Sequence, residues 1–263
     1  MIDFHSHLVP AVDDGAATLD ESRQALAHMR DAGVTTLVTT PHFQASMTEH
    51  PARLAAGMEA LDRGWRELSE LAAAEFPALR VERGVELMLD SPRPVLDDPR
   101  LRLAGTRFVL VEFPFQGVPP GAARALFDLK VAGWLPIVAH PERYPQVGEE
   151  LAGPEEWRKV GAALQVNWGS LAGRYGPGPQ RAAWALLNRG WADYLSSDHH
   201  ARGRLGVGAA REMLIARGGQ EQLRMLSEVN PARMLAGEPP LEVPPLPERA
   251  GFWRRLLGRG PGG

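Results

Sequence analysis

Seven short apolar runs, rich in β-branched residues, recur along the chain, and segments with turn-forming or polar residues separate them. Runs of this length and composition are typical of buried strands. They cover Met1–His5, Thr35–Thr40, Arg80–Leu87, Arg107–Phe113, Leu135–His140, Leu164–Asn167 and Asp193–Ser197. The sequence therefore predicts a β-rich framework that extends over most of the chain.

Helical periodicity fills the intervals between these runs. Leu19–Ala32 carries apolar residues on one face, Thr18 and Glu21 have the spacing of a capping box, and Gly33 is a natural stop. Further helices are predicted over Pro51–Ala74, Pro120–Ala132, Gln180–Asn188, Ala209–Arg217, Gln220–Glu228 and Pro231–Leu235. Alternating strands and helices predict an α/β fold with a mainly parallel sheet. Seven units are too few for the usual eightfold barrel, so we expect a distorted or open seven-stranded (β/α) barrel.

The composition changes after residue 237. Glu238–Glu248 contains five prolines in eleven residues, which favours extended chain. We expect one domain over residues 1–237 and a Pro-rich linker with a flexible basic and aromatic tail over residues 238–263. Within this tail, Phe252–Leu257 could make weak contact with a membrane surface or a partner, or could simply be a frayed end.

Composition and charge exclude several classes of function. The 263 residues include 29 basic and 32 acidic side chains, a net charge of −3, which gives no support to a nucleic-acid partner. The chain has no cysteine, which excludes disulfides, thiolate metal ligands and cysteine-based catalysis. It shows no signal-peptide pattern and no apolar run of about 18 residues, so we expect a cytoplasmic enzyme.

Metal-type side chains stand at or just beyond the ends of most of the apolar runs. His5 and His7 share one face of a strand because they are two residues apart. The other candidates are Asp13, Asp14, His42, Glu86, Glu112, His140, Asp198 and His200. The carboxyl ends of barrel strands meet at one rim, so these residues together indicate a metalloenzyme.

Each residue alone permits a simpler explanation. A single histidine is more often a hydrogen-bonded core residue than a ligand, and Arg83 could pair with Glu86 in place of a metal. His28 and His50 lie away from strand ends and are expected on the surface. His199 would point away from its neighbour His200 in extended chain. The ensemble therefore carries the metal prediction, and no single residue does.

The ordered motifs resemble the PHP (polymerase and histidinol phosphatase) superfamily. Within it, the chain is similar to the bacterial tyrosine-protein phosphatases found with capsule and exopolysaccharide export systems. The matching segments are Ile2–His7, Val12–Gly15 with Glu21-Ser22, Thr39–His42, Gly84–Glu86, Val111–Phe113, Ala139–Tyr144, Gln165–Asn167 with Gly169–Leu171, and Ser197–His200. The resemblance runs from residue 1 to about residue 235 and implies a distorted seven-stranded barrel.

This resemblance implies a site for three divalent metal ions, usually manganese, although zinc or iron would also suit the donors. The implied ligands are His5, His7, Glu86 and Asp198 for the first ion, Glu86, Glu112 and His140 for the second, and Asp14, His42 and His200 for the third. Glu86 would then bridge two ions.

The resemblance also implies catalytic and substrate-binding arginines. Arg143 would hold the phosphate, and Arg204 is favoured over Arg202 as a second phosphate ligand, although the spacing fits imperfectly. His42 or His200 could protonate the leaving group. The expected reaction is hydrolysis of a phosphate monoester by a metal-bound hydroxide, on a tyrosine-phosphorylated protein such as a bacterial tyrosine autokinase of polysaccharide export.

Two alternatives remain open at this point. A small-molecule phosphatase acting on histidinol phosphate would use the same metals. A non-catalytic PHP module with a regulatory or binding role is the alternative from another class, although all nine ligands that the resemblance implies are present.

Overall fold

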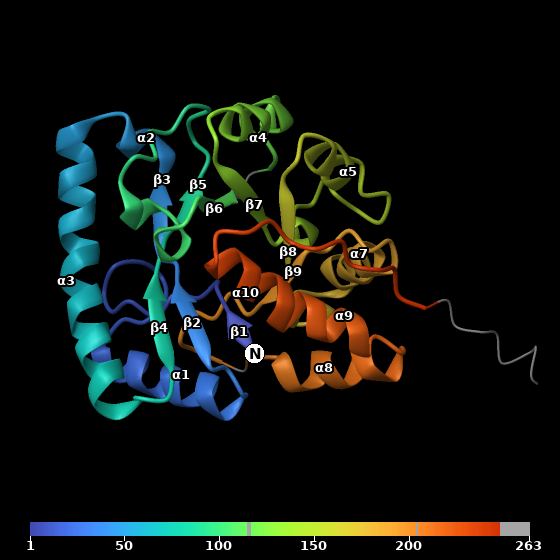
Figure 1. The fold of residues 1–263 in the computed structure, drawn as a ribbon, viewed down its shortest axis with the longest axis horizontal. Helices are drawn as coiled ribbons and strands as arrows, with labels where there is room; N and C mark the ends of the chain where they lie inside the picture. Colours follow the sequence, from blue (N-terminus) through green and yellow to red (C-terminus); the bar gives the residue numbers. More distant parts are fainter. Residues whose placement is uncertain (115–116, 204, 248–263) are drawn as a thin grey trace, which may run out of the picture.

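The computed structural model describes residues 1–114, 117–203 and 205–247, with the strands in the middle and helices around them (Figure 1). The strands are β1 (Ile2–Asp3), β2 (Thr36–Thr39), β3 (His42–Gln44), β4 (Arg80–Arg83), β5 (Glu86–Met88), β6 (Phe108–Glu112), β7 (Leu135–Ala139), β8 (Ala163–Asn167) and β9 (Tyr194–Ser196). All pairings between these strands are parallel, which confirms the predicted α/β class.

The described strands form two sheets, with the orders β1-β2-β4 and β3-β5-β6-β7-β8-β9. Nine strands stand where seven were predicted. The predicted run Arg80–Leu87 breaks at Gly84-Val85 into β4 and β5, and β3, which begins after Pro41, beyond the predicted strand end at Thr40, was not predicted. Proline lacks the N–H that a ladder needs. Thr36 lies opposite Arg80 and His42 opposite Glu86, so the two runs keep one register across the break. The chain segments β2–β3 and β4–β5 therefore run side by side from the first sheet into the second.

Most predicted helices are present, with shifts of a few residues at their ends. The helices are α1 (Leu19–Asp31), α2 (Ala45–Thr48), α3 (Pro51–Glu75), α4 (Ala122–Val131), α5 (Ala152–Lys159), α6 (Trp168–Leu171), α7 (Pro177–Asn188), α8 (Val207–Ala216), α9 (Gln220–Arg224) and α10 (Asn230–Leu235). The turns of 3-10 helix are η1 (Pro99–Leu101), η2 (Leu103–Gly105) and η3 (Pro141–Arg143), and η4 (Met225–Val229) is a π-helical turn. None of the helices in the described ranges combines the length and apolar character that a membrane crossing requires.

Alternation along the strands separates an outer core from an inner one. Val109 and Val111 of β6 belong to the large apolar cluster with the surrounding helices. Phe108 and Leu110 point to the opposite face, into an inner cluster that includes Phe4 and Ile137. Glu112 follows Leu110 on this inner face. The inner core therefore fills one end of the strands and leaves their carboxyl ends for polar side chains.

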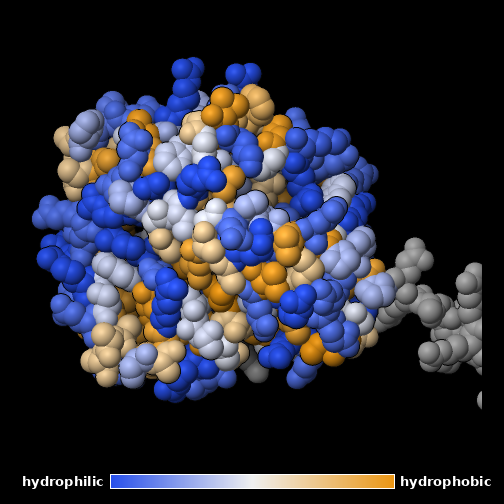
Figure 2. All heavy atoms as spheres, in the orientation of Figure 1, coloured by the Kyte–Doolittle hydropathy of each residue, from blue (hydrophilic) through white to orange (hydrophobic). Residues whose placement is uncertain are grey.

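Residues 238–247 are extended, as their prolines predict, and they pack along the outside of the C-terminal helices (Figure 1). Val243 and Leu246 are buried in the outer core. Asn230 accepts a hydrogen bond from the Leu241 N–H at 2.8 Å and donates one to the Leu241 carbonyl at 3.0 Å. We call residues 238–247 the strap. On the face shown in Figure 2, hydrophilic residues predominate around the rim and smaller apolar patches lie between them.

The strap begins directly after the predicted domain boundary at residue 237, and it packs against the domain. The boundary itself stays a prediction. The expected membrane or partner contact of Phe252–Leu257 lies outside the described residues.

Replacing Asn230 should destabilise the protein through the strap. Asn230 is fully buried and also donates to the Asp193 carbonyl at 3.0 Å, so Asn230→Ala leaves this buried carbonyl and two part-buried backbone groups of Leu241 without their partner. We expect the free energy of unfolding to fall by about 2–4 kcal/mol. Glu238→Ala, which removes only an exposed partner of Arg233, should cost less than about 1 kcal/mol. Equal losses in urea titrations of the two variants would contradict this role for the strap.

Candidate metal centre and active site

The first two histidines are fixed by their backbone. Ser6, between them, forms a parallel bridge with His199, and the His7 N–H donates to the His199 carbonyl at 2.8 Å. The loop after His7 folds back so closely that a Cβ on Gly15 would lie 2.1 Å from the His7 carbonyl oxygen. Only glycine permits this approach. Because the loop folds back, the Asp13 carboxylate lies within hydrogen-bond distance of the His7 ring.

A hydrogen bond at Nδ1 orients each of these two imidazole rings. His7 Nδ1 lies 2.7 Å from Asp13 Oδ2, and His5 Nδ1 lies 2.8 Å from Gln165 Oε1. Because both partners are acceptors, each Nδ1 carries the proton in the neutral ring and each Nε2 presents a lone pair. The two Nε2 atoms are 3.4 Å apart. Two facing lone pairs in a fully buried place repel each other unless protons or a metal ion occupy them, and the orientation of the rings matches a carboxylate–histidine–metal arrangement.

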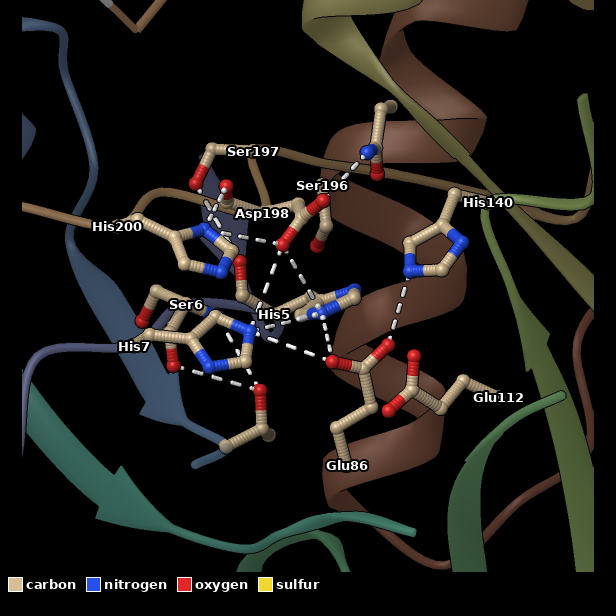
Figure 3. A network of polar contacts seen from close by, with 12 residues as sticks. His5, Ser6, His7, Glu86, Glu112, His140, Ser196, Ser197, Asp198 and His200 are labelled. Atoms are coloured by element: carbon tan, nitrogen blue, oxygen red, sulfur yellow. Dashed lines mark hydrogen bonds and ion pairs between the residues drawn. The ribbon is translucent and has the colours of Figure 1, made fainter. Parts of the chain in front are cut away.

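Glu86 is the centre of the cluster (Figure 3). Its side chain is fully buried, and Oε2 lies 3.1 Å from His5 Nε2, 3.3 Å from His7 Nε2 and 3.2 Å from His42 Nδ1, yet has no hydrogen-bond partner. Its other oxygen lies 2.9 Å from His140 Nε2. The alternative partner Arg83 instead pairs with Asp62 at 2.8 Å. The buried carboxylate is therefore surrounded by imidazoles, and no lysine or arginine of the described ranges forms an ion pair with it.

Asp198 closes the first group from the opposite side. Its Oδ1 lies 3.4 Å from the Nε2 atoms of both His5 and His7, and its Oδ2 accepts hydrogen bonds from Asn167 and Arg143. Asp198 and His140 have backbone φ values of 52° and 35°, in the left-handed region that is uncommon for residues other than glycine, although aspartate and histidine enter it more often than most. Two such residues in one cluster are typical of functional sites.

His42 stands between the buried group and the solvent. Its Nδ1 lies 2.9 Å from Glu112 Oε1, and its Nε2 lies 3.4 Å from Asp14 Oδ1. His200 Nε2 also lies 3.4 Å from Asp14 Oδ1. Potential ligand atoms gather in three overlapping groups, namely His5, His7, Glu86 and Asp198; His42, Glu86 and Glu112; and His7, Asp14, His42 and His200.

The structure thus brings all nine predicted ligands to one place. The first group has the membership expected from the resemblance. In the second group, His42 stands with Glu86 and Glu112, where His140 was expected. His42 belongs to two groups because its Nδ1 faces Glu86 and Glu112 and its Nε2 faces Asp14. His140 contacts Glu86 from the far side. His28 and His50 are exposed, as predicted, and both lie on or beside helices.

The electrostatics of the buried group fit bound cations. Burial lowers the pKa of His5, but the carboxylates of Glu86 and Asp198 outweigh it and raise that pKa to about 9. Burial raises the pKa of Asp198, and His5 and His7 outweigh it, so that the net shift is downward. The cluster stabilises positive charge on its nitrogens and negative charge on its oxygens. An imidazole and carboxylate donor set of this kind suits manganese, zinc or iron.

The cluster opens into a cavity of about 680 Å³. Asp14, His42, Glu112, His140 and His200 line it, and Arg143 reaches in beside them. The Arg143 guanidinium also lies over the Tyr175 ring, 4.5 Å from its centroid. Arg202 pairs with Glu21 at 3.3 Å, whereas Arg204 lies outside the described residues.

Three supporting residues are not among the ligands or catalytic residues that the resemblance implies. Asp13 orients His7, and Gln165 joins His5 to Asn167, whose side chain donates to Asp198. Gln165 and Asn167 alternate with apolar residues on β8, so two amides on one face of a buried strand were the available signal. Asp13 stood beside the chosen Asp14, and only the fold of the loop distinguishes them.

Comparison with known proteins identifies relatives that match most of this chain. Tyrosine-protein phosphatase YwqE of Bacillus subtilis is 31% identical over 263 residues, which cover 98% of this chain and 99% of the relative. Tyrosine-protein phosphatase CpsB of Streptococcus agalactiae is 31% identical over 171 residues, 64% of this chain and 67% of the relative.

A solved structure from work on YwqE of Bacillus subtilis and CpsB of Streptococcus pneumoniae, described as unique metal-dependent tyrosine phosphatases, superposes with a TM-score of 0.77. It is 29% identical and the match covers 95% of this chain and all of that one. The family model for capsular polysaccharide synthesis proteins CpsB/CapC matches residues 1–236. The chain belongs to the CpsB/CapC family of capsular polysaccharide synthesis proteins.

Proposed function

We propose that this chain is a metal-dependent protein-tyrosine phosphatase. The observation that carries the proposal is Glu86, a fully buried carboxylate whose oxygens lie within 3.3 Å of nitrogens from His5, His7, His42 and His140. The relatives named as tyrosine-protein phosphatases support the same activity. Phosphate-ester hydrolysis is the reaction that such a cluster beside an arginine serves best.

The proposal includes three divalent ions, most simply manganese, held by His5, His7, Asp14, His42, Glu86, Glu112, His140, Asp198 and His200. When bound, such ions acidify water and neutralise the non-bridging phosphate oxygens. The distorted barrel is also part of the proposal. The bridge from Ser6 to His199, which joins the ends of β1 and β9, supports it.

The protein's own side chains would position the substrate and move its proton. Arg143 reaches the cavity with one N–H held by Asp198, and the rest of its guanidinium can donate to phosphate oxygens. His42 and His200 line the cavity, and a ring nitrogen of either that is not bound to a metal could give a proton to the leaving oxygen. Tyrosine leaves with a pKa near 10, so this proton matters less than it would for serine.

The substrate we propose is a tyrosine-phosphorylated protein, in particular a tyrosine autokinase of polysaccharide export. The capsular family supports this choice over histidinol phosphate. The complete set of nine ligands argues against a non-catalytic module. A cytoplasmic location and the identity of the partner stay predictions.

Removing one buried ligand should abolish metal binding and activity together. His5→Ala and Asp198→Ala each delete a donor from the most buried group, so we expect loss of bound metal by elemental analysis and loss of p-nitrophenyl phosphate hydrolysis. His50→Ala, an exposed histidine beside α3, is the matched control and should keep both. Activity like that of the unaltered protein in a preparation free of metal would refute the proposed function.

Metal binding should release protons. The pKa of His5 is raised to about 9 and that of His7 is raised well above its ordinary value, so both rings hold protons near pH 7 that a metal must displace. Apparent affinity for Mn²⁺ should therefore rise with pH up to about 9. Calorimetric titrations at pH 7 in buffers of different ionisation enthalpy measure the released protons, and identical heats in all buffers would contradict this account.

Arg143 should act on the substrate and leave the metals in place. We expect Arg143→Met to reduce kcat/KM on a phosphotyrosine peptide by about 10²-fold, because it removes a charged pair of donors. Metal content should stay near that of the unaltered protein. Comparison with Arg204→Met and Arg202→Met decides which of those two also contacts phosphate, and an unchanged kcat/KM in Arg143→Met would remove Arg143 from the mechanism.

A further inference from the structure

The cavity has an apolar side that the proposed chemistry does not use. Next to the metal-type residues it is lined by Phe43 of β3, Met47 of α2, Met88 of β5, and three residues of α3, namely Gly57, Ala60 and Leu61. Phe43 and Leu61 are buried, whereas Met47 and Met88 are half-buried. One continuous space of about 680 Å³ therefore joins these apolar side chains to His42 and Glu112.

Strand register fixes where this apolar side begins. Met88 lies opposite Gln44 of β3 and Glu112 of β6, while Glu86 lies opposite His42. Because residues two apart share a face, Met88 stands on the same face as Glu86, but Met88 is half-buried where Glu86 is fully buried. Two residues along a strand span roughly 7 Å. This is comparable to the length of a phenyl ring with its ester oxygen.

Gly57 keeps this side of the cavity open. A Cβ at Gly57 would lie 2.8 Å from Met47 Cε and 2.8 Å from Phe43 Cε2. Because the helix has no side chain there, Phe43 and Met47 pack directly against its backbone. Ala60, one turn later on the same face, is also small. A larger residue at position 57 would push both side chains towards the cavity.

We propose that Phe43, Met47 and Met88, together the aryl wall, bind the aromatic ring of phosphotyrosine and give the enzyme its preference for aryl over alkyl phosphates. This inference rests on the proposed function. An apolar ring gains by leaving water, and methionine sulfur makes favourable contacts with aromatic rings. The short side chain of phosphoserine would leave the aryl wall uncovered. The metal cluster and Arg143 hold the phosphate in either substrate, so selectivity comes from the aryl wall.

The test compares two phosphopeptides of one sequence that differ only in phosphotyrosine or phosphoserine. The double substitution Met47→Gln and Met88→Gln keeps side-chain length but makes the aryl wall polar. We expect kcat/KM on the phosphotyrosine peptide to fall about tenfold, with the phosphoserine value changed less than about twofold. Met213→Gln on α8, a partly buried methionine outside the cavity, is the matched control and should change neither.

Inhibition gives a readout that does not depend on turnover of the weaker substrate. The inhibition constant for inorganic phosphate should be unchanged in the double variant, whereas that for phenylphosphonate should rise about tenfold. Gly57→Ala is an independent second variant. It favours the helix intrinsically, but it should displace Phe43 and Met47 and weaken phenylphosphonate selectively.

The outcomes separate the two proposals. An unaltered, metal-loaded protein that hydrolyses neither peptide would overturn the proposed function. Hydrolysis of phosphotyrosine with equal losses on both peptides, or with an equal rise in both inhibition constants, would overturn the aryl wall and leave the phosphatase in place. Selective loss on the aryl ligands in both variants would support the aryl wall.

Discussion

The burial of Glu86 is the constraint on which the site depends. An ionised carboxylate without partners is expensive to bury, and here the partners are imidazole nitrogens of His5, His7, His42 and His140. Since imidazoles are good partners for a buried anion only when they are protonated or share a cation with it, divalent ions relieve the cost on both sides. The same ions would supply the chemistry, so the stability of this buried polar centre and the proposed activity have one physical cause.

The fold provides this centre through register, tight turns and a supporting layer. The strand register places His42 beside Glu86, and it places Met88 of the apolar wall beside the ligand Glu112 in the next row. The chain turns in the left-handed conformation at His140, directly after β7, and at Asp198, shortly after β9. Behind the ligands, Asp13 and Gln165 fix the rings of His7 and His5. A cavity that is charged at one end and apolar at the other results, and a phosphorylated aromatic side chain has the same two-part character.

Sequence reasoning reached the elements whose signals are local. The positions of the strands follow from short apolar runs, and α1 begins where Thr18 and Glu21 form hydrogen bonds at its N-terminus. It did not reach features that depend on distant partners. The breaks that create β3 and β5 occur where two runs pass jointly between sheets. The strap is attached in part through Asn230 and Gln222, which lie on other elements, and the space for Phe43 depends on Gly57, fourteen residues away on another element. Candidate ligands were predictable because each ends or follows a strand. That His42 belongs to two of the ligand groups was not predictable, because it depends on how the neighbouring loops are arranged.

The most direct test of the central claim is anomalous diffraction at the manganese absorption edge from crystals of the Mn²⁺-loaded protein. We expect three peaks around the Glu86 carboxylate, one of them among His5, His7 and Asp198. Ordered density for these side chains without an anomalous peak beside Glu86, in crystals whose metal content is verified, would contradict the account.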